Sequence, residues 1–451
     1  MKRLERAFPG TFRLTILGSL KRLLTELKDA RERHKQRHRP TGFEFASADR
    51  IQFLNADHWD AATAGSGFFL RRSYLALLEK CCPKGLHLRF ALIYQQGEPK
   101  AAVVAQILRV SGDKVFGEGK SHKPNLLQRA LSPAARKASA VVQERVLICG
   151  NLFSWGCHGV AFAPGGAPDE LWPAVTEALY RIRRAERLSG ETNFVFIKDL
   201  SASDQENARV LRRFSYRPIK TDPDMVLELR PEWRTYNDYL GSLDRKYRKS
   251  AQHIAKKIEE AGCVLERRKS LESCALRLHE LYLAVHEHAT VRPVTVSPEY
   301  MPALAREAGE SFACIVIRRG EEVLGFVTLV RDGELGIGYY IGYDRSAAAT
   351  LPLYLRLLHA VVEQAIQWGC QRLSLGRTAL EPKARLGATP QPLFIWARHR
   401  HPAVNFFVRK LVYAIPHEEP LQRNPFKAAV GVVDRTGDNR PGADRVPGRE
   451  D

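Results

Sequence analysis

The sequence predicts an α/β protein of two similar domains in tandem, each with a mixed sheet flanked by helices. Its 451 residues exceed the ~100–200 residues of a usual domain. A strand–turn–strand pattern occurs twice, as FALIYQQGEPKAAVVAQIL at 90–108 and as FACIVIRRGEEVLGFVTLV at 312–330. Each copy precedes a predicted helix and a further strand, which is the order of a parallel crossover. These observations together indicate an internal repeat, in which two domains have the same order of strands and helices.

The elements follow in the same order in both halves. In the first half, strands are predicted at 90–94, 101–108, 145–150 and 193–198, with a helix at 169–187. In the second half, strands are predicted at 312–317, 323–330, 335–341 and 372–375, with a helix at 351–368. We expect Thr350 to cap this last helix and Gly369 to end it.

The two halves meet near Pro231, which gives predicted domains at 43–230 and 231–427. Apolar residues spaced by three or four predict one long helix over 236–261, which starts with a capping box of Thr235 and Asp238. Two segments fall outside the repeat. The stretch 111–144 is predicted to be a basic insertion, and the glycine-containing tail 428–451 is predicted to be disordered.

Positive charge is concentrated in an N-terminal arm. The chain has 70 Lys+Arg and 50 Asp+Glu, a net charge of +20, and residues 1–42 hold 12 basic and 4 acidic side chains. Within this arm, leucines at helical spacing predict a basic amphipathic helix over 12–28. Such a helix can lie on an anionic membrane surface or touch nucleic acid, including tRNA. The alternative is that it packs its leucines on the body.

Composition and motifs exclude several classes of protein. Eight cysteines are too sparse for a disulfide scaffold, no apolar run approaches the ~18 residues of a membrane span, and the N-terminus does not resemble a signal peptide. We therefore expect a cytoplasmic protein, peripheral at the inner membrane face if the arm binds lipid. P-loop, dinucleotide, serine-hydrolase and HExxH motifs are absent from the sequence, and we expect no metal.

The predicted order of elements resembles the GNAT N-acyltransferase fold, present twice. The resemblance is carried by CGN at 149–151, NARVLRRFSY at 207–216 with DMVLEL at 224–229, SLDRKYRKS at 242–250 and GRTALEPKARLGA at 376–388. In this order they resemble the bacterial tandem-GNAT proteins of the acetyltransferase-6 group, which are related to Fem-type peptidoglycan-branching transferases. The resemblance implies acyl transfer with acyl-CoA, such as acetyl-CoA, as the co-substrate.

The GNAT fold also implies a slot for the acyl donor between the strands at 335–343 and 372–376. Gly338 and Gly342 suit close approach by a donor, and tight packing explains them equally well. Tyr339 and Tyr340 are candidates for protonating a leaving group, and core packing is the alternative. Because side chains alternate along a strand, we expect at most one of these two tyrosines to face a ligand.

Lys383 is the main catalytic candidate, because it lies where the chain most resembles the family's lysine-containing final motif. Its ammonium could stabilise the oxyanion of a tetrahedral intermediate. A solvated basic loop is the alternative, and Glu381 is the weakest candidate for a base. Basic side chains are further candidates for holding the donor or substrate: Lys246, Arg248, Arg345, Arg377 and Arg385.

Three functions remain open from the sequence. The first is an N-acyltransferase that moves an acyl group from acyl-CoA to an amino group, with an envelope sugar or precursor as acceptor. The second is a Fem-type peptidoglycan transferase that uses aminoacyl-tRNA. It is favoured by the lack of glycine at 344–349, where acetyl-CoA-dependent members have a glycine-rich pyrophosphate loop. The third is a non-catalytic tandem scaffold at an anionic surface.

Overall fold

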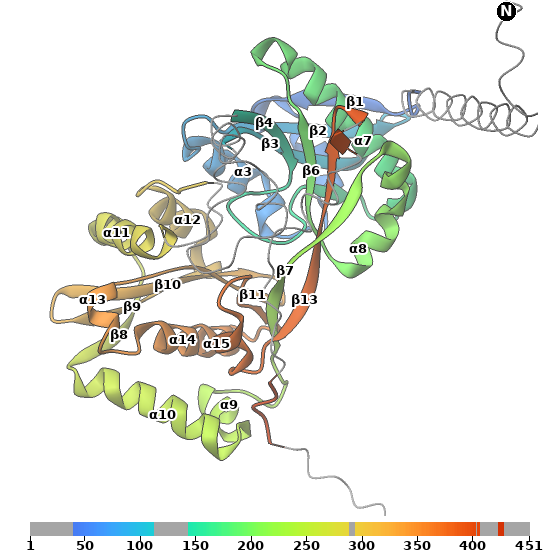
Figure 1. Ribbon diagram of the computed structural model, residues 1–451. Helices are drawn as coiled ribbons and strands as arrows, with labels where there is room; N and C mark the ends of the chain where they lie inside the picture. Colours follow the sequence, from blue (N-terminus) through green and yellow to red (C-terminus); the bar gives the residue numbers. More distant parts are fainter. Residues whose placement is uncertain (1–38, 112–142, 288–293, 403, 406–422, 428–451) are drawn as a thin grey trace, which may run out of the picture.

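The computed structural model describes residues 39–111, 143–287, 294–402, 404–405 and 423–427. The described strands form one sheet in the order β1-β2-β3-β4-β6-β13-β7-β12-β11-β10-β9-β8, and β5 pairs with β3 beside this path (Figure 1). Most of the predicted N-terminal arm, the predicted insertion and the predicted tail lie outside the described residues. What the sequence predicts for these three segments stays a prediction.

The first half contains the predicted meander and crossover. Its strands are β1 (Glu44–Ala48), β2 (His87–Gln95), β3 (Glu98–Ser111), β4 (Gln143–Cys149), β5 (Val160–Phe162), β6 (Phe194–Leu200) and β7 (Arg217–Glu228). Its helices are α2 (Ala56–Ala62), α3 (Arg72–Lys80), α7 (Pro168–Ala185) and α8 (Ala202–Asn207). β4 and β6 pair in parallel, as a crossover through α7 requires.

The second half repeats this plan. Its strands are β8 (Cys263–Arg268), β9 (Phe312–Arg319), β10 (Glu322–Asp332), β11 (Leu335–Tyr343), β12 (Arg372–Ser374) and β13 (Thr389–His399). Its helices are α9 (Tyr236–Ser242), α10 (Arg245–Glu260), α11 (Ala275–His286), α12 (Tyr300–Ala308), α13 (Arg345–Ala348), α14 (Leu353–Gln367) and α15 (Leu380–Ala384). β11 and β12 pair in parallel around α14, so the predicted repeat is confirmed.

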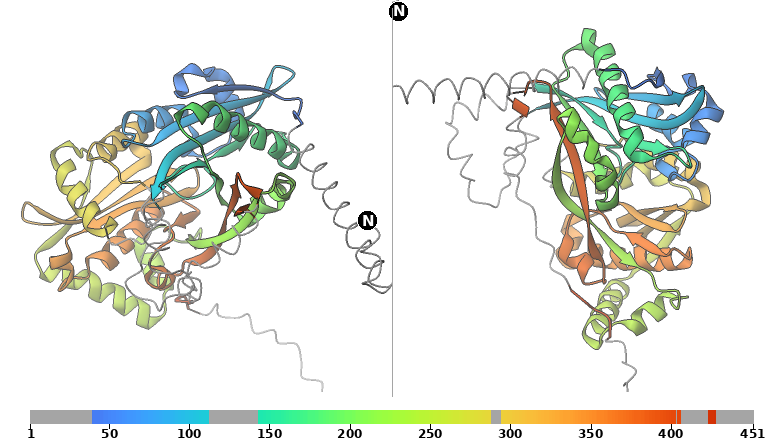
Figure 2. Two further views of the ribbon diagram at one scale, coloured as in Figure 1. Left: turned by 45° about the horizontal axis from the view of Figure 1, so that its top comes forward. Right: turned by 90° about the vertical axis from the view of Figure 1, so that its right-hand side faces the viewer.

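The two halves exchange their closing strands. β7 follows the first crossover in the chain, yet it pairs with β12 of the second half and with β13. β13 comes from the second half and pairs with β6 of the first. Both long strands run side by side between the upper and lower parts of the molecule (Figure 2). One continuous sheet therefore contains strands from both halves, on either side of Pro231 in the sequence.

The hydrophobic core also crosses the halves. One cluster joins the α2 and α3 side of the first half to the α11 and α12 side of the second, with Tyr74, Tyr300 and Tyr339 in its centre. The opposite face is covered by α7 in the first half and by α14 in the second, and each has a cluster of its own. The shared cluster buries apolar surface from both halves, which is the main force that holds them together.

The long helix predicted over 236–261 is two helices. The capping box of Thr235 and Asp238 starts α9 as predicted, but the chain becomes extended at Leu243, and α10 begins at Arg245. Leu243 is buried and forms a bridge with Phe426, and the Asp244 amide donates to the Pro425 carbonyl. Contact with this distant segment breaks the helix, at a point where Gly241 lowers helix propensity.

The N-cap predicted for the crossover helix of the second half is also wrong. α14 begins at Leu353 with Pro352 as its N-cap, and no side chain caps it. Thr350 instead lies before the helix, and its hydroxyl donates to the Ala347 carbonyl. The end of the helix is as predicted, since Gly369 has a φ of 68°.

A β-bulge in β11 changes which way its tyrosines point. Val327 of β10 faces Ile341 and Leu329 faces Gly338, so Tyr339 and Tyr340 lie opposite the single residue Thr328. An extra residue in one strand breaks the alternation of side chains. The two tyrosine rings are 4.4 Å apart, so both lie on one face of the sheet. The expectation that they face opposite sides is wrong.

The eight cysteines are all free. Among the helices that the structure describes, none is both long enough and apolar enough to cross a bilayer.

Candidate active site

The two strands predicted to form the donor slot, β11 and β12, diverge after a short paired stretch. The two strands pair from Leu335 with Arg372 to Ile337 with Ser374, and the pairing then stops. Beyond Ser374 the chain turns at Gly376, whose φ is 81°, and enters α15 after Ala379, whose φ is 52°. A left-handed alanine is an unfavourable conformation that the surrounding structure has to hold. This turn carries α15, and with it Lys383, to the first half's strand β7.

Lys383 is a buried cation. Only 4% of its surface is exposed. Burial lowers the pKa of its ammonium to about 8, and the nearby Asp224 carboxylate opposes this shift. The alternative of a solvated basic loop is therefore wrong for this side chain. A lysine whose pKa is close to neutral is typical of functional sites.

Asp224, from β7, lies close enough to Lys383 to affect its pKa, and its carboxylate is bound by groups of the second half. Its carboxylate accepts hydrogen bonds from the Ser374 hydroxyl at 2.7 and 2.8 Å and from the Gly376 amide at 3.0 Å. Burial raises the pKa of Asp224 to about 6, although these hydrogen bonds and Lys383 act in the opposite direction. The exchanged strand thus brings a carboxylate of one half to a lysine of the other.

The first half also contributes Trp155 to this arrangement. Its indole Nε1 donates to the Ser374 hydroxyl at 2.7 Å, which leaves that hydroxyl to donate to Asp224. The ring of Trp155 covers Gly376, where an added Cβ would lie 3.2 Å from the indole. Its ring centre is 6.1 Å from that of Tyr339. Trp155 therefore links the Lys383 region with the tyrosines of the slot strand.

A second set of charges lies beside the first. Asp199 is fully buried at the end of β6 and pairs with Lys198 and with Arg377, whose Nη1 is 2.9 Å away. Burial alone would raise the pKa of Asp199, but the two cations hold it below its ordinary value. The Arg377 Nε also donates to the Asp222 carbonyl. Arg377, predicted to bind donor or substrate, thus ties the two halves together.

The hydroxyls of Tyr339 and Tyr340 take part in hydrogen bonds that link the two halves. The Tyr339 and Tyr300 hydroxyls are 2.8 Å apart, and the Tyr300 and Tyr74 hydroxyls are 3.2 Å apart. The Tyr340 hydroxyl donates to the Phe153 carbonyl at 3.1 Å. Burial raises the pKa of both slot tyrosines well above the ordinary value, so both stay protonated at neutral pH. Their role as proton donors stays a prediction.

Packing alone accounts for the two glycines proposed to approach the donor. A Cβ at Gly342 would lie 2.6 Å from the backbone of Leu281 and Tyr282 in α11. One at Gly338 would lie 3.1 Å from Val361 of α14 and 3.5 Å from the Ser374 carbonyl. Contact with the donor at these positions stays a prediction.

The remaining predicted residues lie outside this junction. Arg385 and Glu381 form an exposed pair on α15, 2.8 Å apart, and Arg423 also binds Glu381. Arg345 is exposed on α13. Lys246 and Arg248 lie on α10, which packs on α14 and β8. The structure brings only Arg377, of the five basic binding candidates, into the group of charges around Lys383 and Asp224.

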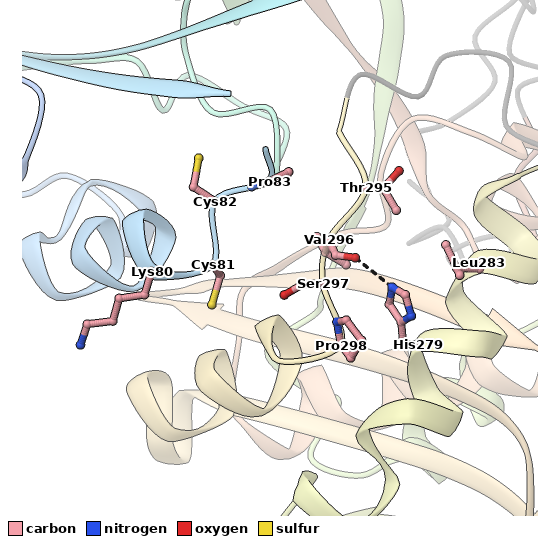
Figure 3. A pocket seen from close by; sticks show the side chains of 10 residues that line it. All are labelled: Lys80, Cys81, Cys82, Pro83, His279, Leu283, Thr295, Val296, Ser297 and Pro298. Atoms are coloured by element: carbon pink, nitrogen blue, oxygen red, sulfur yellow. Dashed lines mark hydrogen bonds between the residues drawn. The ribbon is translucent and has the colours of Figure 1, made fainter. Parts of the chain in front are cut away.

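A pocket of about 450 Å³ opens at a different place between the halves (Figure 3). It lies between the end of α3 and α11, and the His279 Nε2 on its wall is 2.9 Å from the Val296 carbonyl oxygen. It is lined by Lys80, Cys81, Cys82, Pro83, His279, Leu283, Thr295, Val296, Ser297 and Pro298. None of the predicted site residues lines it.

Sequence reasoning missed the residues that surround Lys383. Asp224 gave a signal, because it is a carboxylate directly before the apolar residues Met225, Val226 and Leu227. Trp155, Asp199 and Ser374 gave none, since they meet only through the exchange of strands between the halves. Within the described residues, acidic, histidine and cysteine side chains form no cluster that could hold a metal.

The comparisons with known proteins agree with this architecture. Residues 245–384 match the family model described as Acetyltransferase (GNAT) domain. No curated protein matches the chain. The solved structure of FemX is similar with a TM-score of 0.51 and 10% identity over 81% of this chain and 100% of FemX, which shows a shared fold.

Two further solved structures are similar with a TM-score of 0.45. One is a tandem GNAT protein from the clavulanic acid biosynthesis pathway, at 12% identity over 80% of this chain and 99% of that one. The other is the C-terminal domain of a putative lysylphosphatidylglycerol synthetase from Agrobacterium fabrum, at 11% identity over 80% and 97%. From the repeated fold and the family match, the chain has a tandem GNAT-like fold, and its residues 245–384 match the acetyltransferase-6 model of GNAT domains.

Proposed function

We propose that this protein is an N-acyltransferase whose chemistry takes place at the junction of the two halves, beside Lys383. The observation that carries the proposal is the buried Lys383 ammonium with the half-buried Asp224 carboxylate nearby, at the point where β11 and β12 diverge. A buried cation is costly to maintain unless it has a partner or a function. At pH 7 its pKa of about 8 leaves it mostly protonated and able to donate a hydrogen bond.

The reaction needs a cation where negative charge develops. A neutral acceptor amine attacks the acyl carbonyl, and a C–N bond forms as the carbonyl oxygen becomes an oxyanion. Lys383 would donate a hydrogen bond to that oxygen. The intermediate then breaks the bond to the leaving group, which departs as a thiol or hydroxyl after taking up the proton that the amine loses. Hydrogen bonds from Ser374 and Gly376 fix Asp224, so the position of its charge relative to Lys383 is preset.

Acyl-CoA is the proposed donor, and calorimetry tests it directly. Titration of the full chain with CoA and with acetyl-CoA is expected to show micromolar binding. Lack of binding by CoA and by a panel of acyl-CoA thioesters would remove this donor. The proposed acceptor is an amino group of an envelope sugar or precursor, which follows from the resemblance to Fem-type transferases. Transfer of radiolabelled acetyl groups to amino sugars, but not to their N-acetylated forms, is the expected result.

One observation favours aminoacyl-tRNA as a second candidate donor. The Asp344 carboxylate accepts hydrogen bonds from the Ser346 and Ala347 amides of α13, at 2.9 and 3.0 Å. The Ser346 hydroxyl and these amides lower the pKa of Asp344 to about 2. The Asp344 carboxylate thus already accepts hydrogen bonds from the backbone N–H groups after β11, where an acyl-CoA pyrophosphate would bind. RNA binding that weakens steeply with salt, together with no CoA binding, would support this candidate.

A further inference from the structure

A small hollow in the first half gathers arginines. It lies between α7, β6 and the end of β13, and it is lined by Tyr180, Arg183, Val195, Tyr216, Arg398 and Arg400. Arg398 lies about nine residues along β13 from the end near α15, roughly 30 Å at the rise of a strand. The hollow is therefore separate from the Lys383 site.

Two of these guanidinium groups are close together, and among the described residues they have no acidic partner. Arg183 and Arg398 are both half-buried, and within the described ranges neither forms an ion pair with a carboxylate. Burial lowers the pKa of Arg183, and the nearby charge of Arg398 lowers it further. Two like charges held close together at a half-buried site repel each other, so the arrangement favours an anion between them.

The acid nearest to them is already bound elsewhere. Glu191 attracts Arg183 weakly, but its carboxylate pairs with Arg187 at 3.2 Å and with Arg400. The other groups that face Arg183 are the phenols of Tyr180 and Tyr216. The hollow therefore carries more positive charge than the described acidic side chains neutralise.

The remaining wall supplies a neutral hydrogen-bonding group and sets the size of the ligand. Tyr216 is buried, and the Arg398 guanidinium carbon lies 5.8 Å from the centre of its ring. The hollow has a volume of about 10 Å³, which is room for roughly one water molecule. Only a single compact group can enter it.

We propose that this hollow binds one compact anionic group between Arg183 and Arg398. The group is either a free inorganic anion or a terminal phosphate oxygen of a larger ligand whose remainder stays in solvent. Guanidinium groups present paired N–H donors that match such oxyanions. The site is independent of the proposed acyl transfer, because it shares no residue with the Lys383 junction.

The test titrates the full chain with sodium chloride and, separately, with inorganic phosphate, at an ionic strength kept constant with a bulky organic anion. A saturable rise in the thermal unfolding midpoint is expected at millimolar anion. In Arg183→Gln and in Arg398→Gln the apparent affinity is expected to weaken tenfold or more, since each variant loses hydrogen bonds from a charged group. Saturation by both anions indicates a free inorganic anion, and saturation by phosphate alone indicates a phosphate group.

Arg184→Gln is the matched control. Arg184 is the next residue on α7, also packs over the Tyr180 ring, and does not line the hollow. Its variant is expected to bind anions as the unaltered protein does. Equal, non-saturable responses of all four proteins would overturn the proposal. If either variant fails to fold, modification of the unaltered chain with phenylglyoxal decides the question. Phosphate should protect Arg183 and Arg398 but not Arg184, and equal protection of all three would contradict the site.

Discussion

Lys383 and Asp224 carry opposite charges, yet burial disfavours the charged form of each. The pKa of the lysine falls to about 8 and that of the aspartate rises to about 6, so both are ionised between these values. The structure also separates Lys383 from its neighbours in the sequence. Arg385 is exposed and bound to Glu381, and Arg377 is bound to Asp199, so neither is placed to replace the Lys383 ammonium.

Lys383→Met is therefore expected to lower turnover strongly while donor affinity changes little. If the ammonium supports charge that develops only in the transition state, its loss costs ~2.7–4 kcal/mol, or roughly 100- to 1000-fold in kcat. Steady-state kinetics with calorimetry of donor binding would measure the two effects separately. Arg385→Met is the matched control and should retain turnover. Near-normal turnover in Lys383→Met, with or without Arg385→Met, would remove Lys383 from the mechanism.

The same pair predicts the pH dependence of turnover. Lys383 must be protonated to donate, so its contribution is present below its pKa of about 8 and is lost as pH rises through that value. The Asp224 charge raises the lysine pKa, so Asp224→Asn should shift the alkaline limb of the kcat profile to lower pH. Ser374→Ala keeps the carboxylate and should leave that limb near its original position. An unchanged limb in Asp224→Asn would contradict the coupling.

At the scale of elements, the bulge in β11 is stabilised by a side chain of the neighbouring strand. The Thr328 hydroxyl accepts a hydrogen bond from the Tyr340 amide at 2.9 Å and lies 3.3 Å from the Tyr340 carbonyl oxygen. Thr328 is fully buried in β10. One hydroxyl thus satisfies the backbone groups that the extra residue removes from the ladder.

Thr328→Val is expected to destabilise the protein by about 1–3 kcal/mol, because it leaves the Tyr340 amide buried without a partner. The shapes of the two side chains are similar, so the effect reports the hydrogen bond rather than a cavity. Urea unfolding followed by fluorescence would measure it. Thr328→Ser retains the hydroxyl and should keep most of the stability. Equal losses in both variants would mean that packing, not the hydroxyl, supports the bulge.

The elements show what the sequence could and could not predict. The repeated strands and crossover helices were predictable, because their hydrophobic periodicity and turns are local signals. The break between α9 and α10 was not, since it depends on Phe426, which is distant in the sequence. The approach of Asp224 to Lys383 likewise depends on residues far apart in the sequence, whereas the bulge lies within one hairpin and simply departs from the regular alternation. Local sequence patterns predicted the fold, whereas the surroundings of the candidate site depend on the pairing of strands that are far apart in the sequence.

At the scale of the whole molecule, the exchange of β7 and β13 makes each half incomplete without the other. A fragment that ends at 230 lacks the partner strand β13 for β6, and a fragment that starts at 231 lacks β7 between β12 and β13. The exposed strand edges would be sites for aggregation. The shared core cluster would also be cut open.

Residues 1–230 and 231–427, expressed separately, are therefore expected to be insoluble or unfolded, and co-expression should give a complex that copurifies. The intact chain should unfold in one transition, with the same midpoint by circular dichroism and by fluorescence. A fragment 231–427 that unfolds cooperatively on its own would show that the halves are independent domains. That outcome would also support the boundary at 231 as a domain boundary.

The exchange has a consequence for synthesis on the ribosome. β6 is complete when residue 200 has been made, but its partner β13 needs residues 389–399, almost two hundred residues later. At ~5–20 residues per second, the β6 edge remains unpaired for roughly 10–40 seconds in every nascent chain. The complete sheet can therefore form only when synthesis of the chain is almost finished. Nascent chains of this protein should depend on chaperones that shield strand edges, more than those of single GNAT domains whose strands pair in order of synthesis.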